Sequence, residues 1–185
     1  QPLGLGIKFR AHPLGIGIAG VQMNKLDELN ARRSAYIEAV EAGLGELPGV
    51  EPMGVYPGAE RGGFYGFFVR YDAEAANGLS TDRFIAALRE EGLGARGNGY
   101  PLLHKLPLFA DGFDIFTEGR GALCTPEMGG DYEGYADGEF PIIEEAVSRL
   151  VFLPVLSDPV EDAPQRTLAA LSKVLRHSAA LVQTA

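Results

Sequence analysis

A long stretch of helical periodicity near the start of the sequence restricts the fold more than any other feature. Across residues 13–47, apolar side chains recur at spacings of three, four and seven, with charged side chains largely between them. The apolar positions are Met23, Leu26, Leu29, Ile37, Val40, Leu44 and Leu47. Pro13 suits a first helical position, and Pro48-Gly49 ends the run. A small domain cannot cover so long a helix, so we expect part of its apolar stripe to face a missing partner.

The rest of the pattern predicts a small α+β domain. Strands are expected at 50–55, at 64–71, near Ala95 and at 152–155. Helices are expected at 80–91 and 144–151, with a last one that starts near Asp158 or Asp162 and thins out toward Thr184. The run 64–71 is apolar on both sides, so we expect it to be central and covered on both faces. This order of elements favours a short, mostly antiparallel sheet with helices packed on it.

Residues 111–139 form a long segment without periodicity, rich in Gly, Asp, Glu, Tyr and Phe. So long a loop inside a compact domain is usually functional or disordered. We therefore expect residues 13–185 to be one small domain that contains this acidic, Gly-rich loop. Residues 1–12 begin in a Gly-rich stretch without an initiator Met, and we expect them to be a truncated linker from a longer protein. A purified fragment and an incomplete gene model both remain open as explanations.

Charge and cysteine content exclude several classes of partner. The formal net charge of −9 argues against a nucleic-acid or anionic-membrane surface, because both need dense Lys and Arg. Cys124 is the only cysteine, so the chain has no disulfide framework, and a reducing cytoplasm fits best. No run approaches the roughly 20 apolar residues that a membrane span requires.

Two features of the sequence suggest a dinucleotide-binding site or a metal site at first sight, but their context favours neither. Residues 15–20 match the dinucleotide fingerprint G-x-G-x-x-G, but no buried strand precedes them, which favours a helix start built from small residues. His12, His104 and His177 share no metal-ligand spacing, and Cys124 has no Cys neighbour. We therefore expect no metal site.

Basic residues and an aromatic loop supply the candidate binding residues. Lys8, Arg10 and His12 stand just ahead of the first helix, where cations and free backbone amides can form an anion site; a solvated basic turn is the alternative. The loop from Tyr100 to Phe109 carries two prolines, which would hold His104 at a defined place. A single loop histidine is more often structural than catalytic, and the residues by themselves reveal no catalytic unit.

Four blocks of sequence occur in a characteristic order. The first is Gly6-Ile7-Lys8-Phe9-Arg10, followed by the helical segment 22–33. The second is Leu47-Pro48-Gly49-Val50, followed by the aromatic strand that ends Val69-Arg70-Tyr71. The third comprises 83–88, Glu91-Gly92 and 100–109, and the fourth comprises Phe140-Pro141, 144–146, 153–155 and 158–162. Together they resemble the C-terminal part of the DegT/DnrJ/EryC1/StrS family of sugar aminotransferases, with Arg-Ala-His-Pro-Leu at 10–14 closer to the branch that acts on keto sugars and cyclitols.

This resemblance implies the C-terminal part of a fold-type-I transferase that depends on pyridoxal phosphate (PLP). In the family, the enzyme is a homodimer with active sites at the subunit interface. A lysine holds PLP as a Schiff base, and an amino group passes from glutamate or glutamine to a keto sugar. The aldimine lysine lies upstream of the matching segment, so the resemblance assigns no catalytic residue to this chain. It implies two partners for the chain, its own N-terminal PLP domain and a second subunit.

The resemblance also implies roles for five residues. Lys8 occupies the position of a family Asn that approaches the phosphate of the neighbouring subunit's cofactor, and Arg10 would assist it. His12, Tyr100 and His104 would contact the substrate. Residues 111–139 would form a specificity loop near the mouth of the pocket.

Two other functions stay open at this point. The first is a PLP-dependent sugar dehydrase of the same family, in which histidine replaces the aldimine lysine. The second is a stand-alone, non-catalytic module that binds a partner or small ligand, which the absence of cofactor-anchoring motifs favours. In each case we expect these 185 residues by themselves to be inactive as a transaminase.

Overall fold

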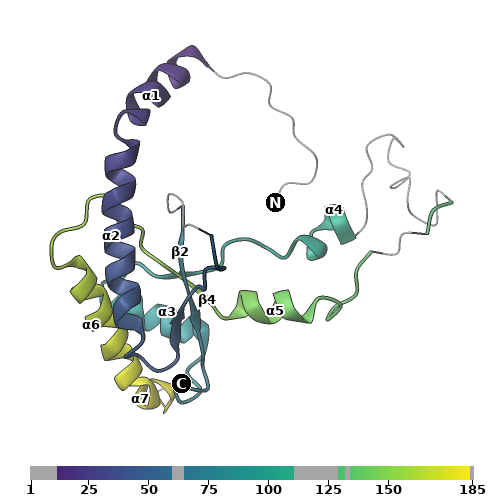
Figure 1. Cartoon of the computed structure of the whole chain (residues 1–185). Coiled ribbons are helices and arrows are strands. Elements are labelled where there is room, and N and C mark those ends of the chain that lie inside the picture. The colour runs from purple at the N-terminus through teal and green to yellow at the C-terminus, as the bar shows by residue number, and fades with distance from the viewer. Residues whose placement is uncertain (1–11, 60–64, 111–128, 132–133, 184–185) are drawn as a thin grey trace. The chain divides into compact units, whose positions relative to one another are not determined.

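The computed structural model describes residues 12–59, 65–110, 129–131 and 134–183 (Figure 1). The chain divides into two compact units. The larger unit comprises His12–Asn98 and Val147–Ala185, and the smaller one includes Gly99–Ala146. The two units are described separately below.

A four-stranded antiparallel sheet forms the centre of the larger unit. Its strands are β1 (Val50–Pro52), β2 (Phe67–Tyr71), β3 (Arg96–Gly97) and β4 (Leu150–Leu153), in the order β1-β2-β4-β3. Val69 of β2 lies opposite Pro52 of β1 and Val151 of β4, so β2 is an inner strand as expected. The short antiparallel sheet that the sequence predicts is confirmed.

The helices of the larger unit are α1 (Pro13–Met23), α2 (Leu26–Leu44), α3 (Thr81–Glu90), α6 (Ala163–Arg176) and α7 (Ser178–Gln183). The smaller unit has a 3₁₀ helix, η1 (Leu103–Lys105), and α4 (Pro107–Ala110), and most of α5 (Pro141–Ser148) belongs to it. Among the described residues, no helix is both long and apolar enough to cross a membrane.

The core lies between one face of the sheet and helices α2, α3 and α6. On β2, the side chains of Phe67, Val69 and Tyr71 are buried and alternate with less buried ones. The Phe67 ring meets Tyr36 of α2 edge-on, with 6.5 Å between ring centroids. The Tyr71 ring stacks on Phe84 of α3 at 4.1 Å. These contacts join the sheet to two helices.

The expectation that β2 is covered on both faces is wrong for the opposite face of the sheet. Phe68 is only half-buried and Arg70 is exposed. Phe68 packs edge-on against Phe152 of β4 at 4.7 Å, and the Arg96 guanidinium lies 3.6 Å from the centre of the Phe152 ring. The aromatic side chains on this face therefore pack against one another. Among the described residues, no helix of the larger unit covers this face.

Three predicted helices differ from the structure. The last one, expected to run toward Thr184, is divided at His177 into α6 and α7. The helix expected over 13–47 is divided at residues 24–25, where the Lys25 amide bonds to the Gln22 carbonyl at 3.0 Å in a tighter turn. The helix expected over 144–151 begins earlier, at Pro141, and ends at Ser148. Leu150 and Val151 belong to β4 instead, because sheet pairing with β2 outweighs the helical pattern at these residues.

Gly49 allows a tight return of the chain between α2 and β1, and its replacement should be costly. Its φ is +81°, and a Cβ placed on it would lie 2.9 Å from the carbonyl oxygen of Asp72. Gly78 has the same φ of +81° with no atom within 4 Å of such a Cβ. We expect Gly78→Ala to lower the free energy of unfolding by about 1–2 kcal/mol from the backbone conformation alone. Gly49→Ala should cost at least about 1 kcal/mol more because of the added clash.

Urea denaturation of the two glycine variants measures this difference directly. Equal losses at Gly49 and Gly78 would show that the loop around Asp72 shifts freely, and that the close approach has no energetic consequence.

Tyr71 makes the stability of the larger unit depend on pH in the alkaline range. Its hydroxyl donates a 2.8 Å hydrogen bond to the carbonyl of Leu79. Burial, helped by the nearby charge of Asp72, raises the pKa of Tyr71 to about 12, above the ordinary value of 10. Because the folded-state pKa exceeds the unfolded one, this stabilisation is complete below about pH 10 and is lost as the pH rises toward about 12.

The measurement is the melting temperature between pH 8 and pH 12, for the wild type and Tyr71→Phe. We expect the variant to melt at a lower temperature at neutral pH and to lose less on alkalisation. Part of the dependence should remain, because burial also raises the pKa of Tyr36. A slope identical to that of the wild type would contradict the assignment to Tyr71.

Candidate functional site

The smaller unit holds the candidate site, and prolines shape the segment that carries its histidine. Pro107 is the first residue of α4, where the missing amide hydrogen costs nothing. Between this proline and Pro101, the Lys105 amide bonds to the Leu102 carbonyl at 3.0 Å and forms η1. His104 therefore sits in a single, hydrogen-bonded turn.

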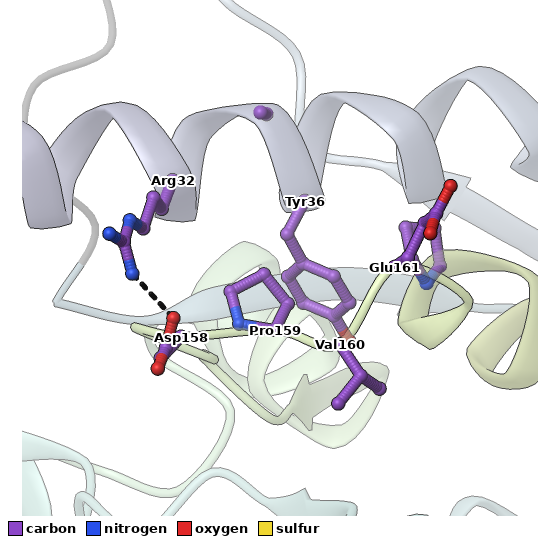
Figure 2. Close-up of a pocket in the computed structure, with 8 residues that line it drawn as sticks. Arg32, Tyr36, Asp158, Pro159, Val160 and Glu161 are labelled. Atoms are coloured by element: carbon purple, nitrogen blue, oxygen red, sulfur yellow. Dashed lines mark hydrogen bonds and ion pairs between the residues drawn. The ribbon is translucent and has the colours of Figure 1, made fainter.

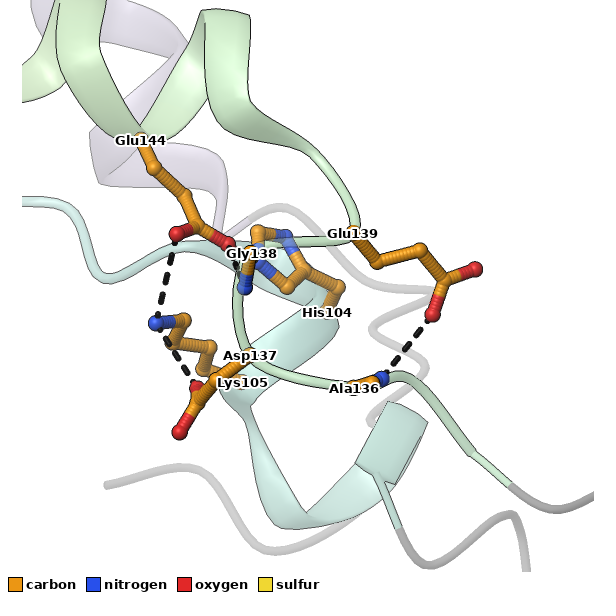
Figure 3. A network of polar contacts seen from close by, with 7 residues as sticks. All are labelled: His104, Lys105, Ala136, Asp137, Gly138, Glu139 and Glu144. Atoms are coloured by element: carbon orange, nitrogen blue, oxygen red, sulfur yellow. Dashed lines mark hydrogen bonds and ion pairs between the residues drawn. The ribbon is translucent and has the colours of Figure 1, made fainter.

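The carboxylate of Glu144 lies at the centre of the polar contacts around His104 (Figure 3). Glu144 Oε1 lies 3.1 Å from His104 Nε2 and accepts a 3.3 Å hydrogen bond from the Gly138 amide. The other oxygen, Oε2, lies 3.8 Å from the Lys105 ammonium group. One side chain of α5 thereby links η1 to the turn that precedes α5.

A second ion pair joins the same two segments. Lys105 Nζ lies 3.0 Å from Oδ1 of Asp137, and this hydrogen bond raises the pKa of the Lys105 ammonium group above its ordinary value. The turn is closed by the Ala136 amide, which donates to Glu139 Oε2 at 2.9 Å. Lys105 thus remains a cation at neutral pH and cannot act there as a free amine.

Aromatic rings border the His104 imidazole. Its ring centroid lies 4.8 Å from that of Phe140 and 6.4 Å from that of Tyr135, and the Tyr135 and Phe140 rings are 5.3 Å apart. The side chain of His104 is 10% exposed and that of Glu144 is 22% exposed. Ring packing and the carboxylate together restrict the rotation of the imidazole. Such a partly dry, polar and aromatic surface suits a hydroxyl-rich ring.

The structure places the other candidate residues differently. His12 belongs to the larger unit and caps α1, accepting a 3.3 Å hydrogen bond on Nδ1 from the Leu14 amide. Tyr100 is largely exposed. Lys8 and Arg10, proposed for the cofactor phosphate, lie outside the described residues. The roles of all five residues therefore stay predictions. His104 lies within the polar network described above.

Sequence reasoning missed the partners of His104. Forty residues separate His104 from Glu144, and no spacing rule connects positions so far apart. Both residues do occur in the blocks that resemble the family, His104 in the third and Glu144 in the fourth. Their presence in these blocks was the one signal in the sequence that could have pointed to a contact between them.

A separate hollow of about 450 Å³ lies in the larger unit, between α2 and the segment before α6 (Figure 2). Its one arginine, Arg32, forms ion pairs with Glu28 and, at 2.5 Å, with Asp158. Its neighbour Arg33 donates to Ser157 Oγ at 2.9 Å. These two arginines, which are part of the first block, hold residues 157–158 on α2, so their role here is structural.

Helix α1 has an unusual surface. All of its residues are exposed, and none of them is charged. The large apolar side chains are Leu14, Ile16, Ile18, Val21 and Met23, each more than half exposed. The G-x-G-x-x-G match of residues 15–20 lies wholly inside this helix, which confirms that it is not a dinucleotide fingerprint. A helix that is apolar all round is normally buried.

No group of three or more His, Cys, Asp or Glu side chains that could hold a metal ion occurs within the described ranges. The His104 imidazole and its carboxylate partner Glu144 offer hydrogen bonding.

Comparison with known proteins gives consistent matches. The model of the DegT/DnrJ/EryC1/StrS aminotransferase family matches residues 2–118. A protein of Streptoalloteichus tenebrarius with the provisional name L-glutamine:3-amino-2,3-dideoxy-scyllo-inosose aminotransferase is 32% identical over 96% of this chain. A protein of Micromonospora echinospora with the same provisional name is 31% identical over 66% of it. The chain spans 42% and 30% of the lengths of these relatives.

Solved structures show the same fold. The aminotransferase TlmJ from Streptoalloteichus hindustanus superposes with a TM-score of 0.61 and 19% identity, over 93% of this chain and 37% of its own. DesV of S. venezuelae, solved in complex with a ketimine intermediate, superposes with a TM-score of 0.59 and 20% identity, over 85% of this chain and 35% of its own. The small α+β fold is therefore that of part of a fold-type-I aminotransferase.

Proposed function

This chain belongs to the DegT/DnrJ/EryC1/StrS aminotransferase family, and from that premise we propose that it is the C-terminal domain of a PLP-dependent enzyme that aminates a keto sugar or cyclitol. The amino donor is glutamate or glutamine. The observation that carries the proposal is the match, over 96% of this chain, to a relative named for glutamine-dependent amination of an inosose, a cyclic polyhydroxy ketone.

The geometry around His104 supports a hydroxyl-rich substrate. An imidazole held by Glu144 and bordered by Phe140 offers one polar atom beside an apolar ring face. Cyclitols present the complementary surface, with hydroxyl groups at the rim and C–H groups on the faces. We place His104 and Tyr100 at the substrate, with His12 as a third contact. Residues 111–139 form the specificity loop in this proposal, and 111–128 and 132–133 lie outside the described residues.

Two lysines of the described residues are engaged in ion pairs. Lys105 is paired with Asp137, and Lys173 is paired with Glu91 at 2.7 Å. A Schiff base requires an uncharged amine, and the hydrogen bond to Asp137 raises the pKa of the Lys105 ammonium group. PLP, when bound, supplies the electron sink for transamination. We propose that other parts of the protein hold it, with Lys8 and Arg10 contacting its phosphate.

Helix α1 supports the proposal that this chain packs against a larger lobe and a second subunit. Fully burying one large apolar side chain stabilises an assembly by about 1.5–3 kcal/mol, and α1 exposes five of them. Relatives more than twice as long as this chain have the additional polypeptide to cover such a helix. We therefore propose that α1 is buried against the chain's own N-terminal PLP domain in a homodimer.

The net charge and the cysteine content of the chain agree with the partners and the cytoplasmic location that we propose. A net charge of −9 argues against nucleic acid or an anionic membrane as a partner. Cys124 as sole cysteine is consistent with a cytoplasmic location.

Sequencing the DNA that precedes the codon for Gln1, and expressing the longest reading frame, tests the proposal. We expect an upstream PLP domain with a Ser-x-x-x-x-Lys segment, and glutamine-dependent amination of a keto cyclitol detected by mass spectrometry. Histidine in place of that lysine would identify a dehydrase instead. A start codon adjacent to Gln1, preceded by a stop codon, would overturn the proposal in favour of a binding module.

A further inference from the structure

Glu144 occupies a position that three segments of the smaller unit share. Its Oε1 atom lies 3.1 Å from Nε2 of His104 in η1 and accepts a 3.3 Å hydrogen bond from the Gly138 amide in the turn before α5. Glu144 itself belongs to the first turn of α5. Figure 3 shows the carboxylate directed toward these groups. The position of the imidazole is therefore coupled to the start of α5.

The chemistry of a carboxylate determines which ring nitrogen of His104 carries hydrogen. An ionised carboxylate can only accept hydrogen bonds, and an imidazole nitrogen without hydrogen can also only accept. Nε2 must therefore carry the hydrogen that it shares with Glu144. In the neutral ring, the hydrogen is then absent from Nδ1, which becomes an acceptor. Among the described residues, Nδ1 of His104 has no hydrogen-bond partner.

The surroundings keep this arrangement in place. The Lys105 ammonium group lies 3.8 Å from Glu144 Oε2, so both oxygens of the carboxylate have a partner. Phe140 packs on the imidazole ring and opposes the flip that would exchange its two nitrogens. The Glu144 carboxylate favours one tautomer of His104, and the Phe140 ring favours one orientation of the imidazole.

We infer that Glu144 is a positioning residue, which holds His104 with Nδ1 as a hydrogen-bond acceptor for a hydroxyl group of the cyclitol or sugar substrate. The inference rests on the proposed function for the identity of the substrate, but the tautomer can be tested without it. Glu144 acts through His104 and does not itself touch the reacting atoms.

The tautomer is measured on the 185-residue chain by ¹H–¹⁵N correlation of the histidine rings at neutral pH, with His104→Asn identifying the His104 signals. We expect protonated Nε2 and unprotonated Nδ1. Glu144→Gln should populate the other tautomer as well, because an amide can donate as well as accept. Glu145→Gln, which removes the same charge at the next position, should leave the His104 signals unchanged.

Two NMR results would overturn the inference. One is a hydrogen on Nδ1 of His104 in the wild-type chain, a result that does not depend on how Glu144→Gln behaves. The other is an unaltered tautomer in Glu144→Gln with the backbone amide spectrum preserved. A merely structural salt bridge at the start of α5 predicts this second result.

Kinetics of the complete enzyme test the link to the substrate. Glu144→Gln should raise KM for the keto substrate about tenfold, the effect of losing one oriented hydrogen bond, and leave KM for the amino donor unchanged. On a His104→Asn background it should add nothing, because the two residues act as one unit. Additive effects would overturn the inference. An enzyme without transaminase activity would refute the proposed function, while the NMR result would still decide the tautomer.

Discussion

Replacing Phe84 with alanine is expected to lower the free energy of unfolding of this protein by about 3–5 kcal/mol. Phe84 is fully buried, and its ring stacks on Tyr71 with 4.1 Å between the centroids and 5° between the ring planes. Removing it leaves a cavity between α3 and β2 that the surrounding side chains cannot fill. Since domains of this size are stable by only about 5–15 kcal/mol, the variant should be unfolded or close to unfolding at 37 °C.

Urea denaturation followed by circular dichroism measures this loss, and Phe68→Ala is the matched control. Phe68 is also on β2 but lies on the opposite, half-buried face, where its replacement should cost about 1–2 kcal/mol. If Phe68→Ala were as costly as Phe84→Ala, the sheet would be covered on both faces in solution, and the assignment of a single core face would be wrong.

Mixing the purified 185-residue chain with PLP is expected to give neither the visible absorbance of an internal aldimine nor transamination of a keto cyclitol. The reason lies in the lysines, because a stable aldimine needs an uncharged amine next to a site that binds the phosphate. Lys105 and Lys173 are engaged in ion pairs with Asp137 and Glu91. The effect should be a complete loss of activity rather than a reduction.

Borohydride reduction followed by peptide mass spectrometry checks for a stoichiometric PLP adduct at one lysine. The Streptoalloteichus tenebrarius relative at full length, treated in the same way, serves as the positive control. A yellow, active preparation of the short chain would contradict the expectation. Lys105→Arg would then show whether Lys105 carries the adduct, since arginine keeps the charge but forms no such Schiff base.

Local signals in the sequence were reliable where a few neighbouring residues contain all the information. Ser80 caps α3 by accepting a hydrogen bond from the Arg83 amide at 3.4 Å, and serine just before a helical run favours this contact. Gly92 follows the same helix with φ of +83°, and Leu93 beyond it is buried. Each of these features depends on backbone conformation within one helical turn.

The resemblance to a known family predicted more about this protein than the periodicity of its apolar residues did. The ordered blocks identified the family, which the comparisons confirm, and with it the fold class. The residues by themselves predicted only a small α+β domain with a short antiparallel sheet, which is also confirmed. The predicted boundary between α5 and β4 was wrong, because Val151 pairs with Val69 of β2, 82 residues earlier in the chain (151 − 69).

The sequence by itself therefore determined the local structure: the helix caps, the approximate helices and strands, and the apolar character of α1. These follow from hydrogen bonds and side-chain periodicity over a few residues. Only the tertiary structure decided which face of β2 is buried, that Arg32 and Arg33 hold residues 157–158, and that Glu144 meets His104. Such pairings depend on the three-dimensional path of the chain, because residues far apart in sequence interact only after folding brings their side chains within hydrogen-bonding distance.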